Sequence, residues 1–394
     1  MADEPLHVLI AGAGVAGLEG ALALHSLAEE RVRVALVAPE EEFTYRPLAV
    51  AEPFRAGDVR RFPLRSLVVD AGATLTQGAV EGVDPERHVL RTDRGELQYA
   101  VLLLALGARP VESVPGAITF AGPADEPALT AVLEQARRGD VQALVFAVPD
   151  GVTWALPAYE LALLTQIHLA DAGVGGVSVE IVTPESAPLE LFGRAAGDAL
   201  RELLELRGVG LTLNSPPASF DNGRLRLHSG DDREADRVVA LPRLEGPRLD
   251  GVPHDADGYV PTDDHGRVEG IDDVWAAGDL TAFPVKQGGL AAQQADAAAE
   301  SIAARAGAPV KPRPFSPVLR GLLLTGLTPR YLRAEAETSA VDTEPLWWPP
   351  AKVVGRHLAP FLASRLGVSP EPPPGAAIEV EVELDVHRTG ARSG

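Results

Sequence analysis

The feature that most constrains the fold is a glycine pattern near the start of the chain. The stretch "HVLIAGAGVAGLEGALALHSL" joins an apolar strand pattern, residues 8–11, through Gly12, Gly14 and Gly17 to a helical pattern over residues 15–28. In such a turn the first glycine permits a tight bend, the second lets the backbone approach a diphosphate, and the third lets helix and strand pack closely. The sequence therefore predicts a strand–turn–helix unit that binds a dinucleotide at the helix N-terminus.

A second apolar strand, "RVRVALVAPE", follows at the distance expected for such a unit. An acidic residue usually closes this strand and hydrogen-bonds the ribose, but Ala38 stands at about that place. Glu40, two residues later, is the substitute candidate, and a solvated loop charge is the alternative interpretation.

Two later stretches favour a flavin as the dinucleotide. "YAVLLLALGARP" has the pattern of a buried strand that ends at Gly107. In "GIDDVWAAGDLTAFPVKQGGLAAQQADAAAESIAARAG", a strand ends at Gly278 and Asp279, and an alanine-rich helix begins near Gly288. A carboxylate at a strand end can hydrogen-bond a sugar-alcohol chain, and the following helix directs its positive end at a ring that becomes anionic on reduction.

The glycine trio, "LALGARP" and "VWAAGDL" together resemble the flavoproteins with two dinucleotide-binding domains, which include disulfide reductases and type II NADH dehydrogenases. "FTYRPL" and "FPVKQGGLAAQQ" most resemble the sulfide:quinone oxidoreductase and type II NADH dehydrogenase branch. The resemblance covers residues 6–310. It implies an α/β fold with two Rossmann-like dinucleotide-binding domains, of which the FAD domain is discontinuous, plus a C-terminal segment.

The same resemblance divides the chain into four parts. Residues 1–117 would form the first part of the FAD-binding domain, and residues 245–312 the second. Residues 118–244 would be an inserted domain with a degenerate glycine motif. Residues 313–394 would cover the flavin, form an interface or contact a membrane.

The resemblance also implies a site for FAD, which is noncovalent because the chain has no cysteine for a cysteinyl link. The residues assigned to the cofactor are Gly12, Gly14, Val15, Ala16, Gly17, Glu40, Arg46, Val80, Ala105, Gly107, Gly278, Asp279, Lys286, Gln287 and Gly288. Asp279 would bind the ribityl chain. Lys286 would stabilise negative charge at the pyrimidine edge of the flavin, or be a solvated loop lysine. Arg46 would contact the cofactor or brace its own loop.

The inserted domain lacks the glycine trio that normally binds NAD(P)H. Its first strand ends in "AVPDGVTW", where Pro149 has no N–H to donate to a phosphate and Trp154 crowds the approach. Its second strand ends in "IVTPES", with Thr183 where a ribose-binding acid is expected and Glu185 two residues beyond. The sequence therefore predicts poor NAD(P)H binding. Trp154 and Lys286 are the catalytic candidates, and a core tryptophan is the alternative interpretation of Trp154.

The absence of cysteine excludes disulfides, cysteine-ligated clusters and thiol nucleophiles. The sulfide:quinone oxidoreductases place a redox cysteine just beyond the turn of the insert, where this chain has Trp154 and Ala155. Cysteine-based sulfide chemistry is therefore excluded, and the sequence predicts no metal cluster.

Composition limits the partners. The formal net charge of −21 repels nucleic acid and anionic bilayers. The start "MADEPLHVLIAGAG" has no leader pattern and no apolar run reaches membrane-spanning length, so a cytoplasmic protein is expected. A homodimer, and peripheral contact with the inner face of a membrane, are left open. The residues that would form an apolar face are Trp347, Trp348, Val353, Val354, Leu358, Phe361 and Leu362.

The sequence thus predicts an FAD-dependent oxidoreductase that passes electrons from an unidentified small-molecule donor to a quinone or another acceptor. The first alternative is an NAD(P)H dehydrogenase with an atypical nucleotide site. The second is a non-catalytic flavin-binding interaction protein.

Overall fold

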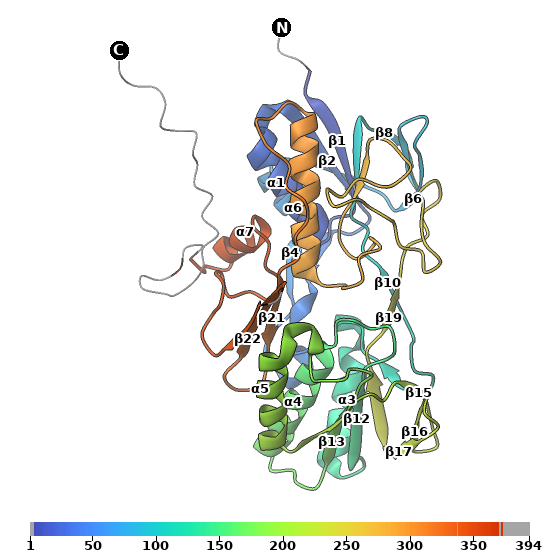
Figure 1. Ribbon diagram of the computed structural model, residues 1–394, viewed down its shortest axis with the longest axis vertical. Coiled ribbons are helices and arrows are strands. Elements are labelled where there is room, and N and C mark those ends of the chain that lie inside the picture. Colours follow the sequence, from blue (N-terminus) through green and yellow to red (C-terminus); the bar gives the residue numbers. More distant parts are fainter. Residues whose placement is uncertain (1–3, 337, 370–371, 373–394) are drawn as a thin grey trace.

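A computed structural model describes residues 4–336, 338–369 and 372. Two parallel sheets of five strands each dominate it, one in the upper and one in the lower half of Figure 1. The strand order is β20-β9-β1-β2-β5 in the first sheet and β11-β18-β12-β13-β14 in the second. In each, the chain passes from a central strand, β1 or β12, to two strands on one side and then crosses to the other side, as in doubly wound folds. The predicted α/β fold with two Rossmann-like units is confirmed.

The first sheet is covered on both faces. Its strands are β1 (Leu6–Ala11), β2 (Val32–Ala38), β5 (Thr74–Gln77), β9 (Val101–Leu104) and β20 (Val274–Ala276). One face packs on the helices α1 (Val15–Ala28), α2 (Leu64–Asp70) and α6 (Gly288–Arg305). The other face packs on a meander of β6 (Val80–Asp84), β7 (Val89–Thr92) and β8 (Gly95–Gln98). Burial on both faces explains why these strands are almost continuously apolar.

Close packing at the glycine turn sets the position of α1. A Cβ added to Gly17 would lie 2.0 Å from the carbonyl oxygen of Gly12, and one added to Gly12 would lie 2.3 Å from that of Ala105. Gly12 also has φ +105°, which disfavours any residue with a Cβ. The helix therefore starts directly against the ends of β1 and β9.

The second sheet has a similar arrangement. Its strands are β11 (Ile118–Thr119), β12 (Ala143–Ala147), β13 (Ser178–Val182), β14 (Val209–Thr212) and β18 (Arg237–Ala240). Its helices are α3 (Glu126–Arg138), α4 (Leu156–Asp171) and α5 (Gly193–Arg207), and a meander of β15 (Pro217–Asp221), β16 (Arg224–Leu227) and β17 (Asp232–Glu234) follows. An antiparallel pair, β10 (Arg109–Val111) with β19 (Arg243–Glu245), connects the two units. We propose the domain boundaries after residues 117 and 244, beside this pair.

The C-terminal segment lies against both units (Figure 1). Its sheet contains β21 (Leu319–Leu323), β22 (Arg330–Glu335) and β23 (Thr338–Asp342), and its helix is α7 (Leu358–Arg365). Strand β23 packs on α5, whereas α7 packs on α1. A smaller pair, β3 (Glu42–Tyr45) with β4 (Arg60–Pro63), lies beside the first sheet.

The apolar face expected in this segment packs mainly on the protein itself. Trp347, Leu358 and Leu362 are 3%, 1% and 6% exposed. In the described part of the chain, no helix is long and apolar enough to cross a bilayer. The proline-rich and charged tail, residues 370–371 and 373–394, lies outside the described residues.

The packing of α1 gives a stability prediction. Gly17→Ala forces the helix away from β1 and should lower the stability by about 1–3 kcal/mol. Gly175→Ala is the control, because a Cβ there meets nothing within 4 Å. Thermal unfolding followed by circular dichroism should show a lower midpoint for the first variant only. Equal midpoints for Gly17→Ala and wild type would contradict the packing argument.

Candidate active site

The glycine turn leaves an open space at the start of α1. Gly14 is the N-cap of this helix, no side chain caps it, and a Cβ added there would meet nothing within 4 Å. The first backbone N–H groups of a helix have no intrahelical partner, and together with the helix dipole they favour an anion. Val15 and Ala16 belong to this first turn. The turn therefore has both the room and the donors that a diphosphate requires.

Two further strand ends converge on this turn. Gly278, just after β20, has φ +88°, and a Cβ added there would lie 3.2 Å from the Cβ of Ala16. Its N–H donates to Oε1 of Gln294 at 2.7 Å, which fixes this strand end on α6. Gly107, beyond β9, has φ +70° and open space around its Cβ position. The sequence-predicted positions at β1, β9 and β20 thus meet at one edge of the sheet.

A cavity of about 600 Å³ extends from this edge to the inserted unit and the C-terminal segment. Of the predicted site residues it is lined by Arg46, Trp154, Asp279, Lys286, Gln287 and Gly288. Gln287 also caps α6, because its Oε1 accepts the N–H of Leu290 at 2.8 Å. Its Nε2 donates to the carbonyl of Arg320 at 3.1 Å, which ties the start of α6 to β21.

Two predicted residues belong neither to the strand ends around the glycine turn nor to this lining. Glu40 is exposed beyond the end of β2. Val80 opens β6 and packs on the apolar cluster that contains Leu9 and Val37. Their contact with the cofactor therefore stays a prediction.

The lining of the cavity contains both a carboxylate, Asp279, and the basic side chains of Lys286 and Arg46. Burial raises the pKa of Asp279, and the positive charges of Lys286 and Arg46 oppose that shift. Burial lowers the pKa of Lys286 to about 8, and Asp279 opposes the shift. The ammonium of Lys286 lies 3.7 Å from the ring centre of Tyr259 and donates to the carbonyl of Thr281. These contacts hold the lysine in the lining rather than in bulk solvent.

A buried ion pair on another wall was missed by sequence reasoning. The ammonium of Lys352 lies 2.6 Å and 2.7 Å from the two carboxylate oxygens of Glu160, and the two side chains are only 7% and 1% exposed. Glu160 also accepts the N–H of Leu324 at 2.8 Å. Its pKa is raised by burial, and Lys352 opposes that shift. A glutamate inside the apolar stretch "PAYELALL" was the available signal.

The turn of the inserted unit closes against the first unit. The hydroxyl of Thr153 donates to the carbonyl of Pro284 at 2.8 Å. The ring of Trp154 lines the cavity and packs on Phe192, with ring centres 5.7 Å apart. Trp154 thus borders the cavity and also packs on the apolar core of the insert, and its catalytic role stays a prediction.

Glu185, the acidic residue beyond the second strand of the insert, is hydrogen-bonded within the protein. The carboxylate of Glu185 accepts from the hydroxyls of Tyr159 at 2.8 Å and Thr183 at 2.9 Å. Burial raises its pKa, and these two hydrogen bonds oppose the shift. Glu185, two residues beyond the position expected for a ribose-binding acid, is thus hydrogen-bonded within the insert.

Comparison with known proteins relates this arrangement to a family. A family model described as pyridine nucleotide-disulphide oxidoreductase matches residues 6–301. An NADH dehydrogenase-like protein of Mycobacterium tuberculosis is 27% identical over 299 residues, which cover 70% of this chain and 72% of that protein. A nitric oxide reductase FlRd-NAD(+) reductase of Aeromonas hydrophila is 28% identical over 177 residues, which cover 43% of this chain and 42% of that protein.

Solved structures agree on the fold. The sulfide:quinone oxidoreductase of Aquifex aeolicus superposes with a TM-score of 0.76 at 18% identity, covering 86% of both chains. A ferredoxin reductase of Rhodopseudomonas palustris superposes with a TM-score of 0.62 at 18% identity, covering 85% of this chain and 91% of that one. Both likenesses concern the fold.

Because Glu160 and Lys352 are buried as a pair, we expect removal of one charge to lower the folding stability more than removal of both. Glu160→Gln leaves the ammonium of Lys352 buried without its counter-charge and should cost about 3–5 kcal/mol. The double variant Glu160→Leu/Lys352→Met removes both charges and should recover most of that loss. Urea unfolding followed by circular dichroism measures both variants. A single variant as stable as wild type, or a double variant less stable than the single, would contradict the pairing.

Proposed function

The chain belongs to the pyridine nucleotide-disulphide oxidoreductase family, and from that premise we propose that it passes electrons through noncovalent FAD to a quinone or a related acceptor. At the level of the family it is a flavin-dependent oxidoreductase, in agreement with the resemblance seen in the sequence. The family's description names disulphide chemistry, but this chain has no cysteine that could form a redox-active disulphide.

The residues at the glycine turn fit FAD. The uncapped start of α1 and the open space at Gly14 would receive the diphosphate, and Asp279 would accept hydrogen bonds from the ribityl hydroxyls. Among the described residues, the carboxylate of Asp279 has no hydrogen-bond donor in the protein, so it has acceptor capacity for a ligand. Bound FAD would supply a carrier that accepts and releases two electrons.

Lys286 is the residue that we propose to balance charge in this site. It lines the cavity on the same loop as Asp279, and with a pKa of about 8 it is mostly protonated at neutral pH. A buried positive charge stabilises negative charge more strongly than an exposed one, since water screens it less. As the pH rises through 8, Lys286 loses its proton and this stabilisation is lost.

The Glu160–Lys352 pair carries the proposal of a quinone. A quinone that gains two electrons becomes neutral by gaining two protons, and a proton-donating side chain beside it can supply one of them. The ammonium of Lys352 is paired with the buried Glu160 and lines the same cavity as Lys286. This buried proton-holding pair at the cavity wall is the observation on which the acceptor assignment rests.

NAD(P)H is the less favoured donor. Pro149 removes a donor from the turn, Trp154 occupies its approach, and Glu185 is hydrogen-bonded within the insert. The second candidate function is an NAD(P)H dehydrogenase with an atypical nucleotide site, because one relative is named as NADH dehydrogenase-like. The electron donor is therefore the property on which the two candidates differ.

Cofactor retention tests the site. Asp279→Ala should weaken FAD binding about 10- to 150-fold, the equivalent of a lost charge-assisted hydrogen bond of about 1.5–3 kcal/mol. Glu40→Ala is the comparison and should weaken FAD binding less, because Glu40 is exposed outside the cavity. Acid release of the cofactor after extensive dialysis, followed by chromatography, gives the occupancy of each variant. Equal occupancy in Asp279→Ala and wild type would count against the assigned role.

Anaerobic stopped-flow absorbance tests donor and acceptor. NADH and NADPH should bleach the flavin slowly, whereas protein reduced with dithionite should be reoxidised rapidly by a short-chain quinone. In Glu160→Leu/Lys352→Met, reoxidation by quinone should slow about tenfold or more, because the proton-holding pair is gone. Ferricyanide, which takes no proton, is the control acceptor and should react as with wild type. Saturable bleaching by NADH within seconds would favour the second candidate.

A further inference from the structure

Three metal-ligating side chains meet outside the cavity described above. Glu19 comes from α1, Asp296 from α6, and His357 directly precedes α7. Their candidate ligand atoms all lie within 4.8 Å of one another. Nε2 of His357 is 3.9 Å from Oδ1 of Asp296. Three separate segments of the chain thus present one nitrogen and two carboxylates to the same point.

Asp296 supplies a second, independent indication of a ligand site. Its Oδ1 atom is buried and has no hydrogen-bond partner among the residues that the structure describes. A buried acceptor without a partner is unfavourable, and more so when it is charged. This oxygen is the one that faces His357. The orphaned atom is therefore aimed into the cluster.

Glu19 is fixed in the orientation that the cluster requires. Its carboxylate is fully buried and accepts the backbone N–H groups of His357 at 2.7 Å and Leu358 at 2.8 Å. A carboxylate oxygen has two lone pairs, so each oxygen keeps acceptor capacity after these bonds. The same contacts place the His357 side chain beside α1 and α6.

The charges around the cluster suit a cation. Glu300 accepts from Arg313 at 2.6 Å and from Arg356 at 3.4 Å. When Glu19 and Asp296 are ionised, they and Glu300 carry three negative charges. Arg313 and Arg356 carry two positive charges, so one negative charge remains. Glu19 and Asp296 come from neighbouring helices and their carboxylates lie close together, so they repel each other when both are charged. A cation bound between them would offset that repulsion.

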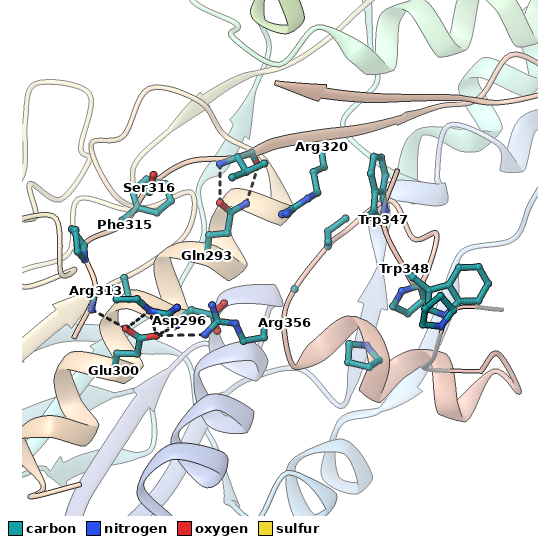
Figure 2. A pocket seen from close by; sticks show the side chains of 18 residues that line it. Gln293, Asp296, Glu300, Arg313, Phe315, Ser316, Arg320, Trp347, Trp348 and Arg356 are labelled. Atoms are coloured by element: carbon teal, nitrogen blue, oxygen red, sulfur yellow. Dashed lines mark hydrogen bonds and ion pairs between the residues drawn. The ribbon is translucent and has the colours of Figure 1, made fainter. Parts of the chain in front are cut away.

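Of the three side chains, Asp296 lines a second cavity of about 390 Å³ together with Glu300 and Arg356, so the cluster borders this cavity through Asp296. Figure 2 shows Asp296 beside Arg356 at one end of this cavity, and Trp347 and Trp348 at the other. The cavity offers both a route for an ion and room for a water molecule to complete its coordination.

We propose that Glu19, Asp296 and His357 bind one divalent transition-metal cation, for which Zn²⁺ is the probe. Imidazole nitrogen with carboxylate oxygen and no sulfur is a ligand set that Zn²⁺ accepts, with bonds of about 2.0–2.2 Å and a water in the fourth position. Tetrahedral ligands at that distance lie roughly 3.4 Å apart, so the 3.9 Å between Asp296 and His357 needs only a small closure.

The bound ion would act as a structural clamp. It joins α1 and α6 of the first unit to the start of α7, and Lys352 lies five residues before His357 on the same segment. Metal binding would thus hold the C-terminal wall of the larger cavity in place. This role needs neither a redox change at the ion nor contact with the flavin.

Calorimetric titration of the FAD-loaded protein, first dialysed against EDTA, with ZnCl₂ tests the proposal. Wild type should bind one equivalent, and its thermal midpoint should rise. Asp296→Asn and His357→Gln should each weaken binding tenfold or more. The controls are Asp264→Asn and His265→Gln, because these residues form a similar pair, 3.7 Å apart, at the surface. Both controls should bind as wild type does.

Two results would overturn the proposal. One is the absence of saturable binding by wild type, and the other is unchanged binding in both Asp296→Asn and His357→Gln. Circular dichroism and flavin absorbance establish that each variant is folded, and if one fails to fold, the other decides. Because the readouts are heat and thermal midpoint, the outcome is independent of whether the donor and acceptor assignments hold.

Discussion

Three buried glutamates hold the C-terminal segment on the two Rossmann-like units. Glu19 of α1 accepts the N–H groups that start α7, Glu160 of α4 pairs with Lys352, and Glu300 of α6 pairs with Arg313 and Arg356. Each interaction crosses from one of the two units to the last segment. The cavity depends on them, because Lys352 and Val353 form part of its wall. Without these anchors its outer side would be open to solvent.

Burying these charged groups is unfavourable because they lose their hydration. Removing two charges from water costs several kcal/mol per ion, and an apolar pair of similar size often gives equal or greater stability. Buried pairs instead favour one geometry, since any displacement leaves a charge without its partner. At the cavity wall that selectivity fixes the ammonium of Lys352 to within hydrogen-bond distance of Glu160. We infer that precise placement, rather than stability, explains why the charges are there.

The sequence predicted what depends on neighbouring residues. The turn from Gly12 to Gly17, the extent of α1 and the start of α6 at Gly288 follow from local spacing. The close approach of Gly17 to the carbonyl of Gly12, for example, lies within one strand–turn–helix unit. The partner of Glu160 lies 192 residues away, so no local pattern identifies it. The hydrogen bonds of Glu185 were equally hidden, because Tyr159 reaches it from the preceding helix. Long-range pairing is decided by packing, which periodicity does not encode.

The inserted unit lacks a glycine trio after its first central strand, β12. Its sheet keeps a doubly wound order, yet Trp154 packs into its core and Thr153 is hydrogen-bonded to the first unit. The same unit supports the C-terminal sheet, since β21 packs on α4 and β23 on α5. Losing it would expose that sheet and remove Glu160 from the cavity wall. We infer that the insert is retained as a wall and a support, a role that depends on its helices and not on a phosphate-binding turn.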